Sequence, residues 1–332
     1  MRTALHYLMQ FEQAEIFLKR EDLLPFSFGG NKVRIAAELF RELEAEGCDA
    51  VVSYGSPTSN LNRVVAQLAR AKGLSCIIVC KEEGKTFGFS DSCRPPLNLR
   101  LVQEAGAQLL VCRPDGVRQA VEEALSRLCR AGKRPYYVYG DSSGSGNEAV
   151  LLRAYARAFQ EIRAYEQECG QPFSALFLAS GTGTTQAGLL LGQAESRRAN
   201  ADGVGDTGGF GKKVLPEVIG ISVARGRRQA EESILGKLAK VLPPDLLAAV
   251  QPQIHVMDAY LAGGYGQYDE RISACIRDMT ERFGLPLDPV YTGKAFCGML
   301  QEIHRRQLSG RLLFLHTGGL PIYFDYLAAH ML

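Results

Sequence analysis

Two patterns of apolar residues take turns along the chain. Short, nearly continuous apolar runs predict strands at 50–54, 75–80, 108–112, 135–139, 173–179, 217–223 and 311–316. Amphipathic stretches predict helices at 33–45, 61–72, 97–105, 117–131, 186–198 and 229–241. This alternation predicts an α/β fold with parallel sheets covered by helices, in which ligands bind at the carboxyl ends of the strands. The Gly- and Asp-rich segment 201–213 breaks the pattern, and we expect it to be a surface loop.

Composition and charge narrow the class of protein. The 332 residues are 46% hydrophobic and 22% charged, which is typical of a soluble globular protein with one large or two modest domains. A net charge of +2 gives no footprint for nucleic acid, and we expect the cluster Arg225, Arg227, Arg228 to be a solvated helix start. No apolar run approaches the roughly 20 residues of a membrane span, and the N-terminus lacks the pattern of a signal peptide. We therefore expect a cytoplasmic protein.

The cysteines give no sign of a metal site or a disulfide framework. The nine cysteines are scattered and odd in number, and no CxxC pair occurs. This usage favours reduced, mostly buried thiols in a cytosolic protein without a metal ion.

The segment 180–188, Ser-Gly-Thr-Gly-Thr-Thr-Gln-Ala-Gly, is the clearest candidate for a binding site. It follows a predicted strand and enters a predicted helix. Its glycines let N–H groups converge on an anion, the hydroxyls can donate further hydrogen bonds, and the helix N-terminus adds positive potential. The alternative is a tight strand-to-helix turn. The segment lacks the lysine of a Walker loop and the spacing of a dinucleotide-binding loop, so we expect it to bind a different kind of phosphate.

Other polar segments also lie at helix entrances or strand ends. A Gly-rich entrance such as Gly29-Gly30-Asn31-Lys32 can fix a lysine and lower its pKa, as a Schiff-base lysine requires, but it can equally be a plain turn. In the segment 56–63, Ser59 or Asn60 can serve as a helix N-cap. The turns at 264–266, 288–295 and 316–319 contain glycines that let a ligand approach, and each indicates little by itself.

Taken together, these segments resemble the family of D-cysteine desulfhydrases and 1-aminocyclopropane-1-carboxylate (ACC) deaminases. That family has fold type II of the pyridoxal-5'-phosphate (PLP) enzymes, like the tryptophan synthase β subunit. The resemblance spans nearly the whole chain, with the motifs in the same order. They are Lys-Arg-Glu-Asp (19–22), Gly-Gly-Asn-Lys (29–32), Ser-Asn (59–60), Gly-Thr-Gly-Thr-Thr-Gln-Ala-Gly (181–188), Asp-Pro-Val-Tyr-Thr-Gly-Lys-Ala (288–295) and His-Thr-Gly-Gly (316–319).

The resemblance implies a role for each motif. Lys32 resembles the lysine that holds PLP as a Schiff base and moves the Cα proton of the substrate. Asn60 resembles the partner of the PLP 3'-oxygen, and Ser59 a residue that holds the substrate carboxylate or acts as a nucleophile. Tyr291 is similar to the tyrosine that stacks on the pyridine ring, and Tyr265 to a second active-site tyrosine. The residues that resemble the phosphate-binding loop are Gly181, Thr182, Gly183, Thr184 and Thr185.

Two positions at the implied cofactor site favour the desulfhydrase branch. ACC deaminases have Glu after the stacking tyrosine and Leu after the last strand's His, whereas this chain has Thr292 and Thr317. A carboxylate would favour a protonated pyridine nitrogen, and a hydroxyl leaves it closer to neutral. The resulting shallower electron sink suits loss of a good leaving group, such as a thiolate, from Cβ.

The chain departs from the family pattern at three places. Leu61 stands where desulfhydrases have His, Pro57 precedes the substrate-side serine, and the loop 140–150 has Val150 where the family has Gly. All three lie where the substrate is selected rather than where PLP is held.

The resemblance implies two three-layer α/β domains with largely parallel twisted sheets. The large PLP-binding domain would comprise 1–45 and 155–332, and a smaller inserted domain, 46–154, would close over the cofactor. The implied enzyme is a homodimeric carbon–sulfur lyase that converts D-cysteine, or a related 3-substituted alanine, to pyruvate, ammonia and sulfide by α,β-elimination.

Several alternatives stay open. On the same cofactor they are a β-replacement synthase of the cysteine-synthase type, a ring-opening deaminase, a racemase or another lyase. Without PLP chemistry they are a binding protein that kept the fold, or an enzyme that uses 181–185 for a nucleotide or sugar phosphate.

Overall fold

The computed structural model describes residues 1–81, 95–201 and 215–330. The chain forms two compact units, each with a sheet of its own. Unit 1 contains Met1–Leu24 and Leu152–Gly319, and unit 2 contains Pro25–Leu151 and Leu320–Leu332. The predicted loop 201–213 lies outside the described residues except for Ala201, which ends a helix.

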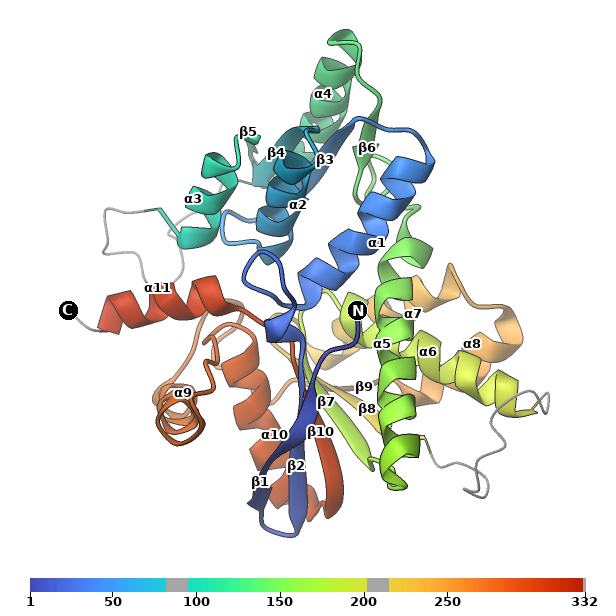
Figure 1. The fold of residues 1–332 in the computed structure, drawn as a ribbon, viewed down its shortest axis with the longest axis vertical. Helices are drawn as coiled ribbons and strands as arrows, with labels where there is room; N and C mark the ends of the chain where they lie inside the picture. The colour runs from blue at the N-terminus through green and yellow to red at the C-terminus, as the bar shows by residue number, and fades with distance from the viewer. Residues whose placement is uncertain (82–94, 202–214, 331–332) are drawn as a thin grey trace. The chain divides into compact units, whose positions relative to one another are not determined.

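Unit 1 is built on a six-stranded sheet of order β1-β2-β10-β7-β8-β9. Its strands are β1 (Leu5–Phe11), β2 (Ala14–Arg20), β7 (Ala175–Ser180), β8 (Glu217–Ser222), β9 (His255–Met257) and β10 (Gly310–His316). β1 and β2 form an antiparallel hairpin, and the other pairs are parallel. β10 pairs with β2 over its whole length, so a strand from each end of the chain lies side by side (Figure 1).

Helices cover both faces of this sheet. On β8, Gly220 faces Gln186 of α6 (Thr184–Ala201), while the next residue, Ile221, contacts Gly298 of α10 (Thr292–Arg306). Because successive residues of a strand point to opposite faces, α6 and α10 lie on opposite sides. The other helices are α5 (Glu148–Cys169, in this unit from Leu152), α7 (Arg227–Ala239), α8 (Pro244–Val250) and α9 (Glu270–Phe283), with short 3-10 turns at Glu21–Leu23 and Gln251–Gln253.

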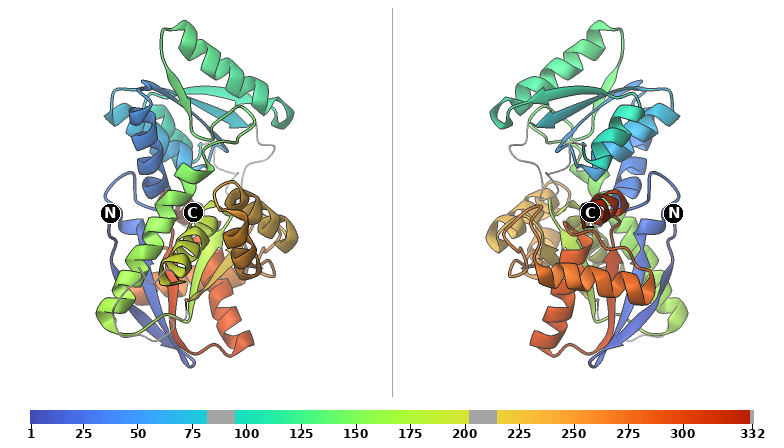
Figure 2. Two further views of the ribbon diagram at one scale, coloured as in Figure 1. Left: turned by 90° about the vertical axis from the view of Figure 1, so that its right-hand side faces the viewer. Right: turned by 90° about the vertical axis from the view of Figure 1, so that its left-hand side faces the viewer.

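Unit 2 contains a four-stranded parallel sheet of order β5-β4-β3-β6. Its strands are β3 (Ala50–Gly55), β4 (Ser75–Lys81), β5 (Gln108–Cys112) and β6 (Pro135–Tyr137). Figure 2 shows α4 (Val117–Arg130) on one face of this sheet, with α1 (Asn31–Ala45) and α2 (Asn60–Ala71) on the other. A short 3-10 turn, Pro114–Gly116, precedes α4.

Two further helices complete unit 2. α3 (Leu97–Glu104) packs against α2, and α11 (Leu320–His330) packs against α3. The Asp325 carboxylate of α11 accepts the backbone N–H of Leu97, with oxygens at 3.2 and 3.1 Å, and so caps α3. The compact units therefore differ from the predicted domain boundaries, which place α1 and α11 in the large domain. Those boundaries stay a prediction.

The predicted α/β class with two largely parallel sheets is confirmed. Every strand and helix predicted from the sequence is present, with shifts of a few residues at the ends. The prediction lacked the β1–β2 hairpin, β9 and five helices, namely α5, α8, α9, α10 and α11. None of the described helices is long and apolar enough to cross a membrane, and the cysteines of the described part are free thiols.

Glycines bring α5 and α6 into backbone contact. A Cβ on Gly188 would lie 2.6 Å from the Cβ of Tyr155, and one on Gly192 would lie 2.7 Å from the carbonyl oxygen of Ala156. Real Cβ contacts are essentially never this short. The position of α6, whose N-terminus carries the 180–185 loop, thus depends on glycine at both positions.

We predict that Gly192→Ala destabilises the protein by about 1–3 kcal/mol, because the added methyl group overpacks the α5–α6 contact. Gly236→Ala is the matched control. It lies inside α7 with open space around its Cβ position, and the helix preference of alanine should raise stability by up to about 1 kcal/mol. Thermal unfolding midpoints measure both, and equal midpoints for the two variants would contradict this account of the packing.

Candidate active site

A strained turn in unit 2 leads into the helix that carries Lys32. Four consecutive residues have left-handed backbone conformations: Ser27 (φ 48°), Phe28 (φ 57°), Gly29 (φ 65°) and Gly30 (φ 98°). Glycine adopts this region freely, but serine and phenylalanine pay a conformational cost there, and such strain clusters at functional sites. α1 begins one residue later, with Lys32 in its first turn.

The environment of Lys32 favours the neutral form of its amine. Its side chain is half-buried, and the loss of hydration lowers the pKa of the amine to about 8. An appreciable fraction of the amine is therefore neutral near pH 7 to 8, as a nucleophile or base requires.

Ser59 and Asn60 lie at the start of α2 in the same unit. The Ser59 Oγ accepts the backbone N–H of Asn62 at 3.2 Å, so Ser59 is the N-cap. Its own O–H proton stays available to donate. The Asn60 Oδ1 accepts from Arg63 at 2.7 Å and from Asn98 at 3.0 Å. The capping alternative therefore holds for Ser59, whereas Asn60 belongs to a side-chain network.

In unit 1, the 180–185 loop joins β7 to α6 and has the features of a phosphate site. Gly183 is left-handed (φ 78°), and a Cβ there would lie 2.6 Å from Ile234 of α7. The hydroxyls of Thr182 and Thr184 lie 3.2 Å apart. No hydrogen bond among the described residues uses the backbone N–H of Gly183 or Thr184, as expected at a helix N-terminus. The Ser180 Oγ is buried and finds no partner among the described residues. These unused donors fit a phosphate group.

Two predicted tyrosines lie together beside this loop. The hydroxyls of Tyr265 and Tyr291 are 2.6 Å apart, and their rings meet edge to face at 6.0 Å. A Cβ on Gly181 would lie 3.8 Å from Cε1 of Tyr291. Unit 1 therefore brings the predicted phosphate loop and both predicted tyrosines into one cluster.

Asp288 organises the turn that contains Tyr291 and Thr292. Its carboxylate accepts the backbone N–H groups of Val290, Tyr291 and Thr292 at 2.8–3.1 Å. The Thr292 hydroxyl donates to the same carboxylate at 2.7 Å and accepts the Asp288 N–H at 2.8 Å. The hydroxyl proton of Thr292 is therefore already used in the hydrogen bond to Asp288 and is not available to a ligand.

The final motif joins this cluster through Gly319. A Cβ on Gly319 would lie 2.2 Å from Oδ2 of Asp288, so only glycine fits there. Thr317, two residues earlier, is 8% exposed, and its hydroxyl makes no hydrogen bond within the described residues. Of the two threonines that the sequence placed at the cofactor, Thr317 is the one with a hydroxyl free to bind a ligand.

Two cationic side chains beside the cluster, Lys294 and Arg225, were not among the predicted site residues. Lys294 is fully buried on α10, and its amine donates to the carbonyls of Leu261 (2.7 Å) and Gly264 (2.6 Å), in the loop that carries Tyr265. Burial lowers the pKa of this amine to about 8. The expectation of a solvated Arg225 is wrong. It is half-buried, donates to the Ser233 Oγ at 3.1 Å and lies 3.5 Å from the carbonyl oxygen of Gly181.

The residues that were absent from the predicted site differ in how clearly the sequence marks them. Asp288 and Lys294 lie inside the quoted 288–295 motif, and Arg63 ends the 56–63 segment. Asn98 lies in an ordinary amphipathic helix and gave no signal at all. Arg227 and Arg228 are exposed and pair with Glu231 and Glu232 along α7, as a solvated helix start predicts.

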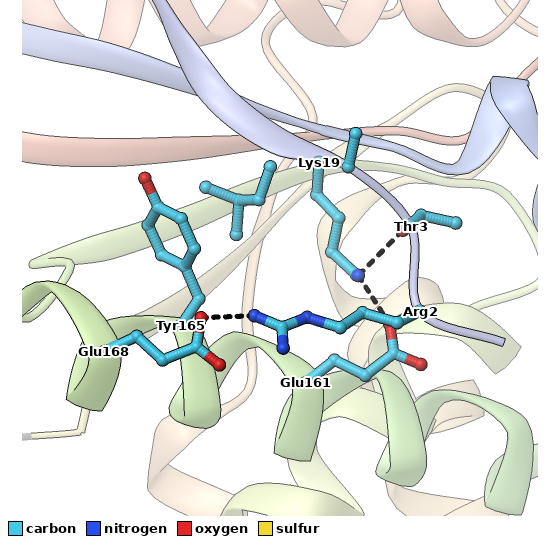
Figure 3. Close-up of a pocket in the computed structure, with 8 residues that line it drawn as sticks. Arg2, Thr3, Lys19, Glu161, Tyr165 and Glu168 are labelled. Atoms are coloured by element: carbon cyan, nitrogen blue, oxygen red, sulfur yellow. Dashed lines mark hydrogen bonds and ion pairs between the residues drawn. The ribbon is translucent and has the colours of Figure 1, made fainter.

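A separate hollow in unit 1 lacks the predicted site residues. It has a volume of about 400 Å³ and is lined by Arg2, Thr3, Ala4, Leu5, Lys19, Glu161, Tyr165 and Glu168. Figure 3 shows that its charges satisfy one another: Arg2 pairs with Glu168, and Lys19 reaches Thr3 at 2.8 Å and Glu161 at 2.7 Å. Paired charges of this kind hold the N-terminal segment against α5.

Comparison with known proteins defines the class. The chain matches the family of pyridoxal-phosphate dependent enzymes over residues 2–318 and belongs to that family. Within it, the chain is 30% identical to a D-cysteine desulfhydrase of Serratia proteamaculans (strain 568), over 94% of this chain and 88% of the relative. It is 29% identical to a putative ACC deaminase of Pyrococcus abyssi (strain GE5 / Orsay), over 98% and 91%.

A solved structure agrees with these relatives. The crystal structure of an ACC deaminase homologue matches with a TM-score of 0.74 and 25% identity, covering 99% of this chain and 94% of the other. The resemblance to the desulfhydrase and deaminase family and the PLP cofactor are thereby confirmed. The substrate is left open, since similar proteins carry both names.

We predict that Lys32 in the protein stripped of cofactor reacts with amine-modifying reagents with a pH midpoint near 8. Surface lysines titrate near about 10.4 and serve as internal controls in the same digest. Mass spectrometry of the modified peptides measures each midpoint. A Lys32 midpoint equal to that of the surface lysines would show that its amine is not desolvated.

We also predict that Lys294→Met destabilises the protein by about 2–4 kcal/mol, because two buried carbonyls lose their charged donor. Hydrogen exchange of the peptide that carries Tyr265 should quicken. Lys72→Met, at a lysine 40% exposed and paired with Glu44, should change stability by less than about 0.5 kcal/mol. Unchanged exchange around Tyr265 in Lys294→Met would contradict the anchoring role.

Proposed function

We propose that this enzyme removes the Cβ substituent of a small amino acid by α,β-elimination, with D-cysteine as the preferred substrate. One water is consumed, and pyruvate, ammonia and sulfide are released. The observation that carries the proposal is the pair Thr292 and Thr317. Within the described residues the Thr317 hydroxyl is free, and the Thr292 hydroxyl donates to Asp288. Neither position has a glutamate. A hydroxyl partner leaves the pyridine nitrogen near neutral, which suits departure of a thiolate.

The resemblance suggests a role for each residue that would hold PLP. The N–H groups and hydroxyls of 181–185 would bind its phosphate, and the α6 dipole adds favourable potential. Tyr291 would lie against the pyridine ring, Thr317 would donate to the ring nitrogen, and Asn60 would donate to the 3'-oxygen. Bound PLP would withdraw electrons from the bonds at the substrate Cα.

Lys32 and Ser59 would act on the substrate itself. Lys32 Nζ would be the covalent anchor of the cofactor and the base for the Cα proton, a task suited to an amine with a pKa of about 8. The Ser59 O–H and the first N–H groups of α2 would hold the substrate carboxylate. The hydroxyl of Tyr265, bonded to that of Tyr291, would provide a proton relay at the ring edge. From family analogy alone we add a cytoplasmic homodimer and closure of the predicted inserted domain.

A second candidate rests on Leu61. This side chain is 6% exposed and stands where the desulfhydrase pattern has His. A leucine supplies no proton at that position, which favours a change of substrate or of the final step. The β-replacement synthase and the ACC ring-opening deaminase are the two reactions to test against elimination.

The experiment is a visible spectrum of the purified protein followed by product analysis. We predict an absorption band of enzyme-bound PLP that is absent in Lys32→Ala and present in the surface control Lys72→Ala. With D-cysteine, sulfide and pyruvate should form in equal amounts. Loss of the Lys32 base should lower kcat by about 10²–10⁴-fold.

Other outcomes point elsewhere. Ammonia and 2-oxobutanoate from ACC would identify ring opening, and product that appears only with an added second nucleophile would identify a synthase. A band that persists in Lys32→Ala would remove Lys32 as the anchor. Turnover of L-cysteine but not D-cysteine would overturn the proposed stereochemistry.

A further inference from the structure

Arg63 is a buried cation in unit 2 to which the proposed function gives no role. It is 1% exposed, and the oxygen atoms that it contacts are neutral. Nη1 donates to the Oδ1 atoms of Asn60 and Asn98, both at 2.7 Å. Nε donates to the Ser27 Oγ at 3.1 Å, and Nη2 lies 3.5 Å from the Gly29 carbonyl oxygen. Burying a charge is costly, so its retention at this place calls for a reason.

The guanidinium determines which way two amides face. Arginine carries donors and no acceptor, so the amide atoms that it contacts must be oxygens. Asn98 then turns its Nδ2 to the Thr58 carbonyl (2.7 Å) and to the Asn60 Oδ1 (3.0 Å). Since Oδ1 of Asn60 receives two donors, the Nδ2 group of Asn60 faces away from Arg63 as a donor for something else.

The same guanidinium holds the left-handed turn before Lys32. Beyond its contacts with Ser27 and Gly29, its Cζ lies 5.9 Å from the ring centroid of Phe28. These three residues belong to the run with φ values of 48–65°. A turn in this conformation persists only when its surroundings hold it there. One side chain thus touches the turn that aims Lys32 and the residue proposed to meet the 3'-oxygen.

We propose that Arg63 is a positioning residue that, with Asn98, locks Asn60 with its amide N–H groups presented to the cofactor and clamps the turn that aims Lys32. The inference rests on the roles of Lys32 and Asn60 in the proposed function. A cation behind the amide also polarises its N–H groups, which strengthens a hydrogen bond to a negative 3'-oxygen. Without Arg63, either face of the Asn60 amide can turn toward that oxygen.

The test compares Arg63→Met, Arg63→Lys and Asn98→Ala with a matched control, Arg163→Met. Arg163 is also buried, at 8% exposure, but it pairs with Glu166 in unit 1. For each protein we would measure the PLP dissociation constant, the pH midpoint at which the visible band of bound PLP changes, and the thermal midpoint. Hydrogen exchange of the peptide that spans residues 25–33 would be followed in the cofactor-free protein.

We expect Arg63→Met to weaken PLP binding by roughly ten- to a hundredfold, the size of a lost hydrogen bond to a charged group. The pH midpoint of the band should rise by about one unit or more, because the ionised 3'-oxygen loses its donor. Arg63→Lys keeps the charge but not the planar fork, and Asn98→Ala keeps one donor to Asn60, so both should be intermediate. Arg163→Met should lower the thermal midpoint and leave both PLP readouts unchanged.

Three results would overturn the inference. One is an Arg63→Met protein with wild-type band midpoint and PLP affinity and only a lower thermal midpoint, like Arg163→Met. The second applies if Arg63→Met does not fold: a wild-type PLP affinity and band midpoint in both Arg63→Lys and Asn98→Ala would then overturn the inference. If the wild-type protein binds no PLP, the proposed function fails separately, and unchanged exchange of 25–33 in Arg63→Met then overturns the clamp.

Discussion

The parallel pairing of β2 with β10 is the constraint on which unit 1 depends. It runs from Gly310 opposite Ala14 to His316 opposite Arg20, so it joins strands from the two ends of the chain inside the sheet. β7 and β8 extend the same sheet in parallel. Because parallel strands share one carboxyl edge, the loops that follow β7, β8 and β10 emerge there. This explains why segments far apart in the sequence, at 180–185 and 316–319, can serve one site.

Each unit contains buried charges that are held by neutral or backbone groups beside predicted site residues. Lys294 bonds two carbonyls, Asp288 accepts three backbone N–H groups, and Arg63 bonds side-chain and backbone oxygens. Each costs desolvation energy, and removing the charge alone would leave its hydrogen-bond partners unsatisfied. What each provides is orientation, since a buried charge with several directed hydrogen bonds tolerates few arrangements of its partners. Lys294 contacts the loop with Tyr265 and Asp288 the turn with Tyr291, and in our proposal Arg63 would fix the Lys32 turn in the same way.

The sequence predicted those parts of the fold whose signal is local. Parallel strands buried on both faces are nearly continuous apolar runs, so β3, β4, β7, β8 and β10 were found. α10 was missed because it begins Thr-Gly-Lys, and its buried lysine interrupts the apolar face that marks a helix. The β1–β2 hairpin was missed because β1 is largely exposed and lies at the edge of the sheet.

In the candidate site, too, the sequence predicted the features that have a local signal and missed the others. Glycine-rich motifs could be recognised because their backbone conformations exclude other residues, as at Gly183 and Gly319. The partners that orient them could not, because a hydrogen bond such as that between Arg63 and Asn98 joins positions 35 residues apart, with no pattern in between. For the same reason Arg225 was assigned to solvent, although its guanidinium lies 3.5 Å from the Gly181 carbonyl oxygen in the 180–185 loop.

The hydrogen bonds within the candidate site determine which threonine hydroxyl can still donate to a ligand. Thr292 cannot be considered apart from Asp288, whose carboxylate accepts a hydrogen bond from the Thr292 hydroxyl and others from the backbone N–H groups of the turn. An ionised glutamate at position 292 has no proton to donate to Asp288, so this hydrogen bond would be lost. The Asp288–Thr292 pair and a carboxylate partner for the pyridine nitrogen are therefore alternatives in this turn. Under the proposed function Thr317 would then be the donor to the ring nitrogen, and reactions with a good leaving group at Cβ would gain over those that need a deeper electron sink.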